Sequence, residues 1–414
     1  MINIVDKKLC CGCSACVQKC PKHCISLQED DEGFAYPVVD KDSCIDCGIC
    51  EKICPMLHQE EKIVSKRVWA AKNTCDEERM NSSSGGVFLL LAKEIIKQGG
   101  VVFGAVYDEK WEVYHVFATQ IEDVYPMMGS KYVQSRIENT YREAEAFLKQ
   151  GQKVMFVGTP CQVAGLRAFL RHKEYDNLLA VDFVCHGVPS PGVWRRYLAE
   201  TFSCVDLNAQ CRRQAAAGKN SVLFSSLNAK SPIGDIKFRD KYESGWKKFR
   251  FVVRQKSASK ADQNTVLSSD IHYMNIFMKG FLNNIYLRPS CYACKCKNGV
   301  NHSDLTLADF WGINTINPSF DDDKGASLIL VNSDRGNAIF ESLKLEKWNS
   351  DLETAKQFNP GFGESISENP LRIRFYEMLN RGNTVEMSIH KCNTSSLAGR
   401  CKSKLKRILK LILK

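Results

Sequence analysis

Short apolar runs alternate with segments of helical spacing along the middle of the chain, between residues 67 and 184. In the helical segments apolar residues recur at intervals of three and four, as at Val87, Leu90, Leu91, Ile95 and Ile96. This pattern predicts helices at 87–97, 142–150 and 161–171, and strands at 68–71, 101–106, 113–119, 153–157 and 178–184. Because strands and helices alternate along the chain, we expect an α/β main domain in which helices cover a mixed sheet.

The pattern changes on both sides of this region. Residues 58–66 are polar without a clear period and predict a linker, which separates an N-terminal domain at 1–57 from the α/β part at 67–204. Residues 205–396 have a weaker, mixed pattern and predict an α+β part.

The last segment, 397–414, is basic and amphipathic. Leu405, Ile408, Leu409 and Ile412 fall on one side of a helix, with lysines on the other. Such a helix can lie on anionic lipid, which predicts peripheral contact with the inner face of the membrane. A helix docked on the domain or a solvated chain end is the alternative.

Composition favours a globular metalloprotein. The 414 residues, 44% hydrophobic and 25% charged, allow several cored domains and exclude a disordered or fibrous protein. No apolar run approaches the roughly 18 residues of a spanning helix. Because 20 cysteines occur without a recognisable secretory signal, we expect metal ligation in the cytoplasm rather than disulfides. The net charge of +10 owes most to the tail, so nucleic acid is not an expected partner.

Two copies of one cysteine run occupy the N-terminal domain. Each has the form C-x2-C-x2-C-x3-C-P, which is typical of bacterial ferredoxins with two [4Fe–4S] clusters; there the last cysteine of each run ligates the other cluster. We therefore assign to one cluster Cys10, Cys13, Cys16 and Cys54, and to the other Cys44, Cys47, Cys50 and Cys20. Zinc is the alternative, but it favours shorter paired motifs. Cys11 and Cys24 fit neither run and are expected to be small thiols, buried or partly exposed, rather than ligands.

Further candidate chemistry lies where predicted strands end. The segment Ser82-Ser83-Ser84-Gly85-Gly86 precedes a helix and is either an anion site or a simple helix cap. The loop at 157–162 lacks the lysine of a P-loop, and no GxGxxG motif is present, so an ATPase or an ordinary dinucleotide site is not supported. Cys185 follows a strand, and Cys291 and Cys294 form a CxxC motif. With Cys161, these thiols could hold another cluster if the strands before Cys161 and Cys185 are neighbours.

The order of these motifs resembles the coenzyme F420 hydrogenase/dehydrogenase beta-subunit family. After the ferredoxin runs come SSGG, GSKY (129–132), GTPCQ, CHGVPSP and CYAC followed by SDLTLADFWG, over residues 5–315. The resemblance implies FAD and a further [4Fe–4S] cluster in the main domain. It implies as ligands of this third cluster Cys161, Cys185, Cys291 and Cys294; the alternative is that Cys296 completes the set in place of Cys161. It implies as contacts of FAD Ser84, Gly85, Gly86, Ser130, Lys131, Tyr132 and Thr159.

Two of these motifs also supply catalytic candidates. Lys131 could stabilise an anionic reduced flavin, and His186 could move protons; a solvated lysine and a structural histidine are the alternatives. Asp309 is expected to cap or turn the chain near Trp311.

Together these features imply a cytoplasmic iron–sulfur flavoprotein oxidoreductase. It would move electrons between a one-electron donor such as ferredoxin, its clusters, FAD and a two-electron substrate, either a deazaflavin or another small molecule. The alternative is a non-catalytic electron-transfer subunit of a larger redox complex, with surface-polysaccharide synthesis as a setting suggested by analogy. A purely structural cluster or zinc protein is a third possibility.

Overall fold

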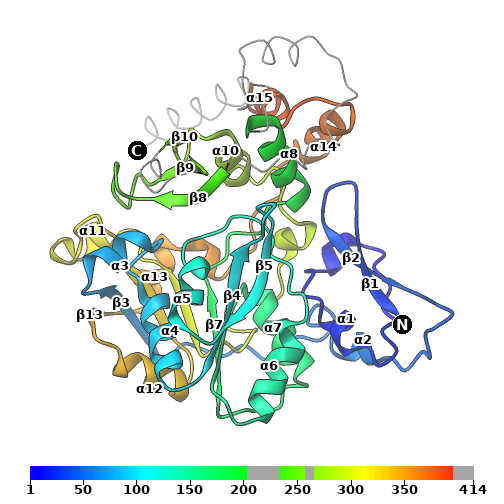
Figure 1. The fold of residues 1–414 in the computed structure, drawn as a ribbon, viewed down its shortest axis with the longest axis horizontal. Helices are drawn as coiled ribbons and strands as arrows, with labels where there is room; N and C mark the ends of the chain where they lie inside the picture. The colour runs from blue at the N-terminus through cyan, green and yellow to red at the C-terminus, as the bar shows by residue number, and fades with distance from the viewer. Residues whose placement is uncertain (203–232, 257–264, 395–414) are drawn as a thin grey trace, which may run out of the picture.

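The computed structural model describes residues 1–202, 233–256 and 265–394, and Figure 1 shows how their elements are arranged. The basic segment at 397–414 lies outside the described residues. Within them, no helix is both long enough and apolar enough to cross a bilayer.

An eight-stranded mixed sheet forms the centre of the molecule (Figure 1). Its strand order is β13-β3-β12-β11-β7-β6-β4-β5, in which β11, β7, β6 and β4 are parallel and the remaining strands pair antiparallel. The strands are β3 Arg67–Asn73, β4 Val101–Tyr107, β5 Val113–Ala118, β6 Val154–Val157, β7 Leu178–Phe183, β11 Leu305–Asp309, β12 Ser327–Val331 and β13 Leu345–Ser350. The predicted α/β domain with a mixed sheet is confirmed.

Helices cover both faces of this sheet because its strands are apolar on both sides. In β4, Val101 and Phe103 pack against α6 and α7, whereas Val102 and Val106 pack against α4. The helices and helical turns around the sheet are α3 Asp76–Asn81, α4 Val87–Lys97, α5 Ile121–Val124, η2 Tyr125–Met127, α6 Thr140–Lys149, α7 Pro160–Phe169, α11 Ile313–Ile316, η6 Pro318–Phe320, α12 Asp334–Ser342, α13 Leu352–Phe358 and η7 Pro360–Phe362.

A smaller antiparallel sheet and four helices form a lobe beside the main sheet (Figure 1). Its core is aromatic: the buried rings of Trp194 and Phe238 contact each other and both contact the buried rings of Phe251 and Phe277. We call this the β8–β10 lobe; it comprises α8 Pro191–Phe202, β8 Ile233–Asp240, β9 Arg250–Gln255, β10 Val266–Ile271, α10 Ile276–Leu282, α14 Arg372–Asn380 and α15 Val385–Thr394. The turn η5 Pro289–Ala293 leads from the lobe back to the main sheet.

The first 57 residues form a small N-terminal module at one side of the main sheet (Figure 1). It consists of η1 Lys7–Leu9, α1 Ala15–Lys19, β1 Ile25–Glu29, β2 Ala35–Val39 and α2 Ile49–Lys52, with β1 and β2 paired as an antiparallel hairpin. The two short helices begin after left-handed residues, Ser14 and Gly48, within the cysteine runs. Most of the rest of the module consists of loops, which carry many of its cysteines.

The N-terminal module packs closely against α6 and α7. The side-chain oxygen of Gln18 accepts the N–H of Tyr141 at 3.0 Å, and Arg142 Nε donates to the carbonyl of Gln18 at 2.6 Å. On α7, a Cβ added to Gly165 would lie 2.7 Å from the Cβ of Cys13. Because that spacing is below an ordinary carbon contact, glycine at 165 is what allows the cysteine-bearing loop to approach.

Candidate functional site: two thiol groups, a third thiol pocket and a cavity

The cysteines of the N-terminal module fall into two groups. Cys16 interacts electrostatically with Cys10 and Cys54, and Cys13 does so with Cys16 and Cys54. The second group lines a separate pocket and comprises Cys20, Cys44, Cys47 and Cys50, together with Cys24. The fourth cysteine of each run therefore lies with the first three of the other run, an arrangement that fits two cubane clusters.

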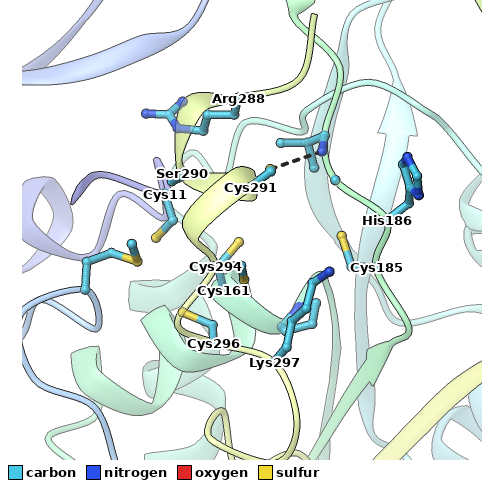
Figure 2. Close-up of a pocket in the computed structure, with 14 residues that line it drawn as sticks. Cys11, Cys161, Cys185, His186, Arg288, Ser290, Cys291, Cys294, Cys296 and Lys297 are labelled. Atoms are coloured by element: carbon cyan, nitrogen blue, oxygen red, sulfur yellow. Dashed lines mark hydrogen bonds between the residues drawn. The ribbon is translucent and has the colours of Figure 1, made fainter. Parts of the chain in front are cut away.

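A further pocket brings together six thiols from four parts of the chain (Figure 2). Its wall includes Cys11, Cys161, Cys185, Cys291, Cys294 and Cys296. Figure 2 shows Cys161 and Cys294 near the centre, with Cys185 across the pocket beside His186. We call this the thiol pocket. All four cysteines assigned to a third cluster are thus neighbours here.

Sheet topology explains why Cys161 and Cys185 meet. Strands β6 and β7 are parallel neighbours, with Val157 opposite Val181, so their carboxyl ends share one edge of the sheet. From β6 the chain turns into α7, whose first residues include Cys161; Thr159 caps this helix in a reciprocal pair with Gln162. The Thr159 hydroxyl lies 3.1 Å from Cys161 Sγ. Local capping therefore fixes the direction of one thiol, and strand pairing places the other.

Burial disfavours the thiolate form of three cysteines in this pocket. Burial raises the pKa of Cys185, it raises the pKa of Cys291 to about 12, and it raises the pKa of Cys294 to about 11. Iron binding needs thiolates, so cluster insertion here would release protons. Among the residues that the structure describes, no three Cys, His, Asp or Glu side chains converge as they would on a single metal ion. A cubane carries four irons and spreads its ligands more widely.

Two cysteines of the thiol pocket, Cys11 and Cys296, are not among the four that were assigned as cluster ligands. Cys11 comes from the N-terminal module and interacts with both Cys161 and Cys296. It is buried, as expected of a small apolar thiol, but it lies on the shared boundary of module and main domain. Cys296 is fully buried in the same wall. Its short spacing from Cys294 was a usable signal, whereas no local pattern pointed to Cys11.

A cavity of about 680 Å³ lies next to the thiol pocket, between the main sheet and the β8–β10 lobe. This volume is within the range of pockets that bind cofactors. The residues predicted to contact FAD that line it are Ser84, Gly86, Ser130, Lys131, Tyr132 and Thr159. Gly85 does not line it: a Cβ there would lie 2.4 Å from the carbonyl oxygen of Ala71, so this glycine permits packing against β3 instead.

The serine–glycine loop forms one wall of the cavity. The N-cap residue of α4 is Gly86, which has a φ of +82° and offers no side-chain cap, so the explanation of the loop as a serine cap is wrong. Instead Ser83 Oγ accepts the N–H of Ser130 at 2.7 Å, and Ser84 Oγ donates to the carbonyl of Ala326 at 3.0 Å. The serines join three segments around the cavity.

Lys131 and His186 both face this cavity. Lys131 Nζ donates to the carbonyl of Met128 at 3.1 Å, and burial lowers its pKa to about 7. His186 Nε2 lies 2.6 Å from Asn284 Oδ1, and burial lowers the pKa of the imidazole. Lys131 is therefore not a solvated surface lysine.

A buried charged and aromatic group closes the lobe side of the cavity. Arg239 pairs with both carboxylate oxygens of Asp309, and the indole of Trp246 donates to Asp309 Oδ1 at 2.9 Å. The rings of Trp246 and Trp311 stack at 4.8 Å. The expectation that Asp309 caps or turns the chain is wrong, because its carboxylate neutralises Arg239 across the cavity edge. An isolated arginine in β8 gave no sequence signal of this role.

The thiol pocket and the cavity share one stretch of wall. Cys185, His186, Gly187 and Val188 line both. Gly187 is tightly fitted, since a Cβ there would lie 3.0 Å from a methyl group of Leu287 and 3.3 Å from the Cβ of Cys291. The segment after β7 therefore separates the two spaces along this wall.

Comparison with known proteins agrees with this architecture. Residues 9–57 match the 4Fe-4S dicluster domain, and residues 151–353 match the family described as the C terminus of the coenzyme F420 hydrogenase/dehydrogenase beta subunit. A coenzyme F420-dependent sulfite reductase of Methanocaldococcus jannaschii is 26% identical over 189 residues, which cover 42% of this chain and only 28% of that protein.

A solved structure of the F420-reducing [NiFe] hydrogenase complex from Methanosarcina barkeri contains a distantly similar chain. The TM-score is 0.42 at 16% identity, over 81% of this chain and 92% of the other. A likeness this distant carries no functional argument. The two family matches identify residues 9–57 as a 4Fe-4S dicluster domain and residues 151–353 as a domain of the coenzyme F420 hydrogenase/dehydrogenase beta-subunit family, and an iron–sulfur redox protein combines the two.

Proposed function

We propose that this chain is a flavin-dependent iron–sulfur oxidoreductase that passes electrons through three [4Fe–4S] clusters to FAD and a two-electron substrate. The observation that carries the proposal is the wall formed by Cys185, His186, Gly187 and Val188, which lines the thiol pocket on one side and the large cavity on the other. A cluster in the pocket and a flavin in the cavity would be separated by these few residues.

The order of the sites forms a path from the surface inward. Cys47 is exposed, so the cluster assigned to Cys44, Cys47, Cys50 and Cys20 would be the outer one. The cluster assigned to Cys10, Cys13, Cys16 and Cys54 lies at the boundary with α7, next to Cys11 and the thiol pocket. The cavity is the end of the path.

The cavity fits a flavin dinucleotide in size and in chemistry. Small residues and left-handed Gly86 leave backbone open at the start of α4, and the Lys131 ammonium supplies a positive charge. Bound flavin would supply the exchange between single electrons from clusters and the electron pair that most organic substrates require. Lys131 would bind and orient the anionic part of the cofactor.

His186 would accept or transfer a proton at the wall that the thiol pocket and the cavity share. With Nε2 donating to Asn284 Oδ1, Nδ1 is the nitrogen left to accept a proton. Burial lowers the pKa of the imidazole, which favours the neutral ring with this nitrogen unprotonated. Phe281 packs edge-on against the imidazole at 5.1 Å and keeps its orientation.

The outer cluster indicates the kind of redox partner. Asp40, Asp42, Asp46 and Glu51 surround the exposed Cys47 in sequence, against Lys41 and Lys52. An acidic face around a cluster would attract a basic patch on a donor or acceptor protein, with an association rate that falls as salt rises.

Cofactor content tests the proposal directly. We expect protein purified without oxygen, or reconstituted with iron, sulfide and FAD, to hold about one FAD and about 12 irons per chain. Reduced ferredoxin should bleach the flavin absorption of this protein. In Ala105→Trp, a large ring enters the cavity wall, so flavin should be lost while iron stays. Lys97→Trp, on an exposed position of α4, is the matched control.

The proposal fails if wild-type protein holds all its iron but binds no FAD. If FAD binds and is reduced, yet no small molecule accepts the electrons while a partner protein does, the chain is an electron-transfer subunit.

A further inference from the structure

Arg288 is a buried cation between the N-terminal module and the thiol pocket. Its side chain is 1% exposed, and its guanidinium contacts the module at three points. Nε donates to the carbonyl of Cys10 at 2.8 Å, Nη2 donates to the carbonyl of Ala35 at 2.9 Å, and Nη2 lies 3.6 Å from Cys10 Sγ. The same residue lines the thiol pocket, three positions before Cys291 (Figure 2).

Each nitrogen of the guanidinium donates at least one hydrogen bond, but its charge has no carboxylate partner in the described part of the chain. Besides the groups above, Nη1 donates to Gln134 Oε1 at 2.9 Å, and the rings of Tyr36 and Phe34 lie 4.4 and 5.5 Å from Cζ. Burial of an uncompensated charge is costly, so its opposite charge must come from something nearby. The thiolate of Cys10 and the cluster that it would hold can supply that charge.

A glycine next to this cation leaves the space that the guanidinium occupies. Gly12 has a φ of +71°, and a Cβ added there would lie 2.8 Å from Arg288 Cζ and 2.8 Å from Gln134 Nε2. The pocket of the outer cluster lacks a buried, uncompensated cation of this kind. The cations in its described wall are Lys22, which is exposed to solvent, and the N-terminal ammonium of Met1, which pairs with Asp46 and Glu51. The two clusters of the module would therefore differ in electrostatic environment, because water and salt screen an exposed charge far more than a buried one.

We propose that Arg288 is a positioning residue that raises the reduction potential of the cluster held by Cys10, Cys13, Cys16 and Cys54 above that of the outer cluster. Four thiolates leave an oxidised [4Fe–4S] cluster a dianion, and uptake of one electron makes it a trianion, with no bond broken and no proton needed. A fixed cation stabilises the more negative form. Electrons entering at the outer cluster would then collect at the inner one, beside the thiol pocket. The direction of this flow rests on the proposed function, whereas the potential itself does not.

A redox titration followed by electron paramagnetic resonance tests this on the full chain with its clusters. In Arg288→Gln the charge is removed, and in Gln134→Glu a carboxylate of the same shape is placed against it. In both variants we expect one cluster signal to become at least tenfold harder to reduce, a fall of about 59 mV or more for one electron, while the other cluster signals keep their potentials. Arg288→Lys should recover part of the fall.

Arg372 provides the matched control. It is also buried at the boundary with the module, but its charge is paired: Nη1 donates to Glu32 Oε1 at 2.6 Å. Arg372→Gln should leave all cluster potentials unchanged. Should Arg288→Gln fail to assemble, Gln134→Glu decides alone. The inference is overturned if intact clusters in Gln134→Glu titrate as in the wild type, or if Arg372→Gln causes an equal fall. Because no flavin is needed, failure here is distinct from failure of the proposed function.

Discussion

Removal of single thiols from the thiol pocket separates cluster ligands from bystanders. Six cysteines line this pocket, whereas a cubane needs four. We assign the cluster to Cys161, Cys185, Cys291 and Cys294. Cys185→Ala should therefore lower the iron content from about 12 to about 8 per chain, and Cys296→Ala should leave it at about 12.

The stability cost of either substitution is too small to confuse this result. Cys296 is fully buried, so its loss leaves a gap the size of one sulfur atom, a change that typically costs about 1 kcal/mol. Such a loss lowers the melting temperature of a large domain by a few degrees at most. Cys185 is only half-buried at the open wall and should cost less still.

The assay is iron and sulfide content of anaerobically reconstituted protein, with circular dichroism to verify folding. The signals of the two N-terminal clusters serve as an internal reference and should be the same in all variants. Loss of four irons in Cys296→Ala, with none lost in Cys185→Ala, would refute the ligand assignment. Equal loss in both would show that packing of the pocket, rather than ligation, had been disturbed.

Particular contacts lead to three further predictions. Gly165→Val should weaken the packing of the N-terminal module on α7, because its first added carbon would lie 2.7 Å from the Cβ of Cys13 and overpacking costs about 1–3 kcal/mol. Proteolysis within 58–66 should then be faster, and an unchanged cleavage rate would contradict the close packing of Gly165 on Cys13. FAD should bind the wild type more weakly as pH rises through about 7, because the Lys131 ammonium loses its proton there, and Lys131→Gln should remove this dependence. Equilibrium dialysis between pH 6 and pH 8 (roughly one unit either side of that pKa) measures the affinity for FAD, and an equal pH dependence in wild type and variant would exclude Lys131 as the anion contact. Asp304→Asn should destabilise the chain by about 3–5 kcal/mol, because buried Arg167 and half-buried Arg335 both pair with this carboxylate. Thermal unfolding measures the change in stability, and a loss of stability below about 1 kcal/mol would show that other groups compensate for the missing charge.

The residues that local spacing could identify were those whose partners lie close in sequence. The helix predicted at 87–97 begins and ends where α4 does, since its apolar period belongs to one face packed on the sheet. The two cysteine runs likewise needed only spacing, because three thiolates at i, i+3 and i+6 reach around one cluster. The α/β character followed from the alternation of such segments.

The meeting of distant segments was decided only by the tertiary structure. Sequence placed Cys185 after a strand and Cys11 outside both runs, but the pairing of β6 with β7 and the docking of the module on α7 set them in one pocket. The same holds for Arg239 with Asp309 and for Arg288 with Cys10, pairs separated by 70 and 278 positions. Local periodicity carries no information about such pairs, because their distances depend on how whole elements pack rather than on the spacing of neighbours along the chain.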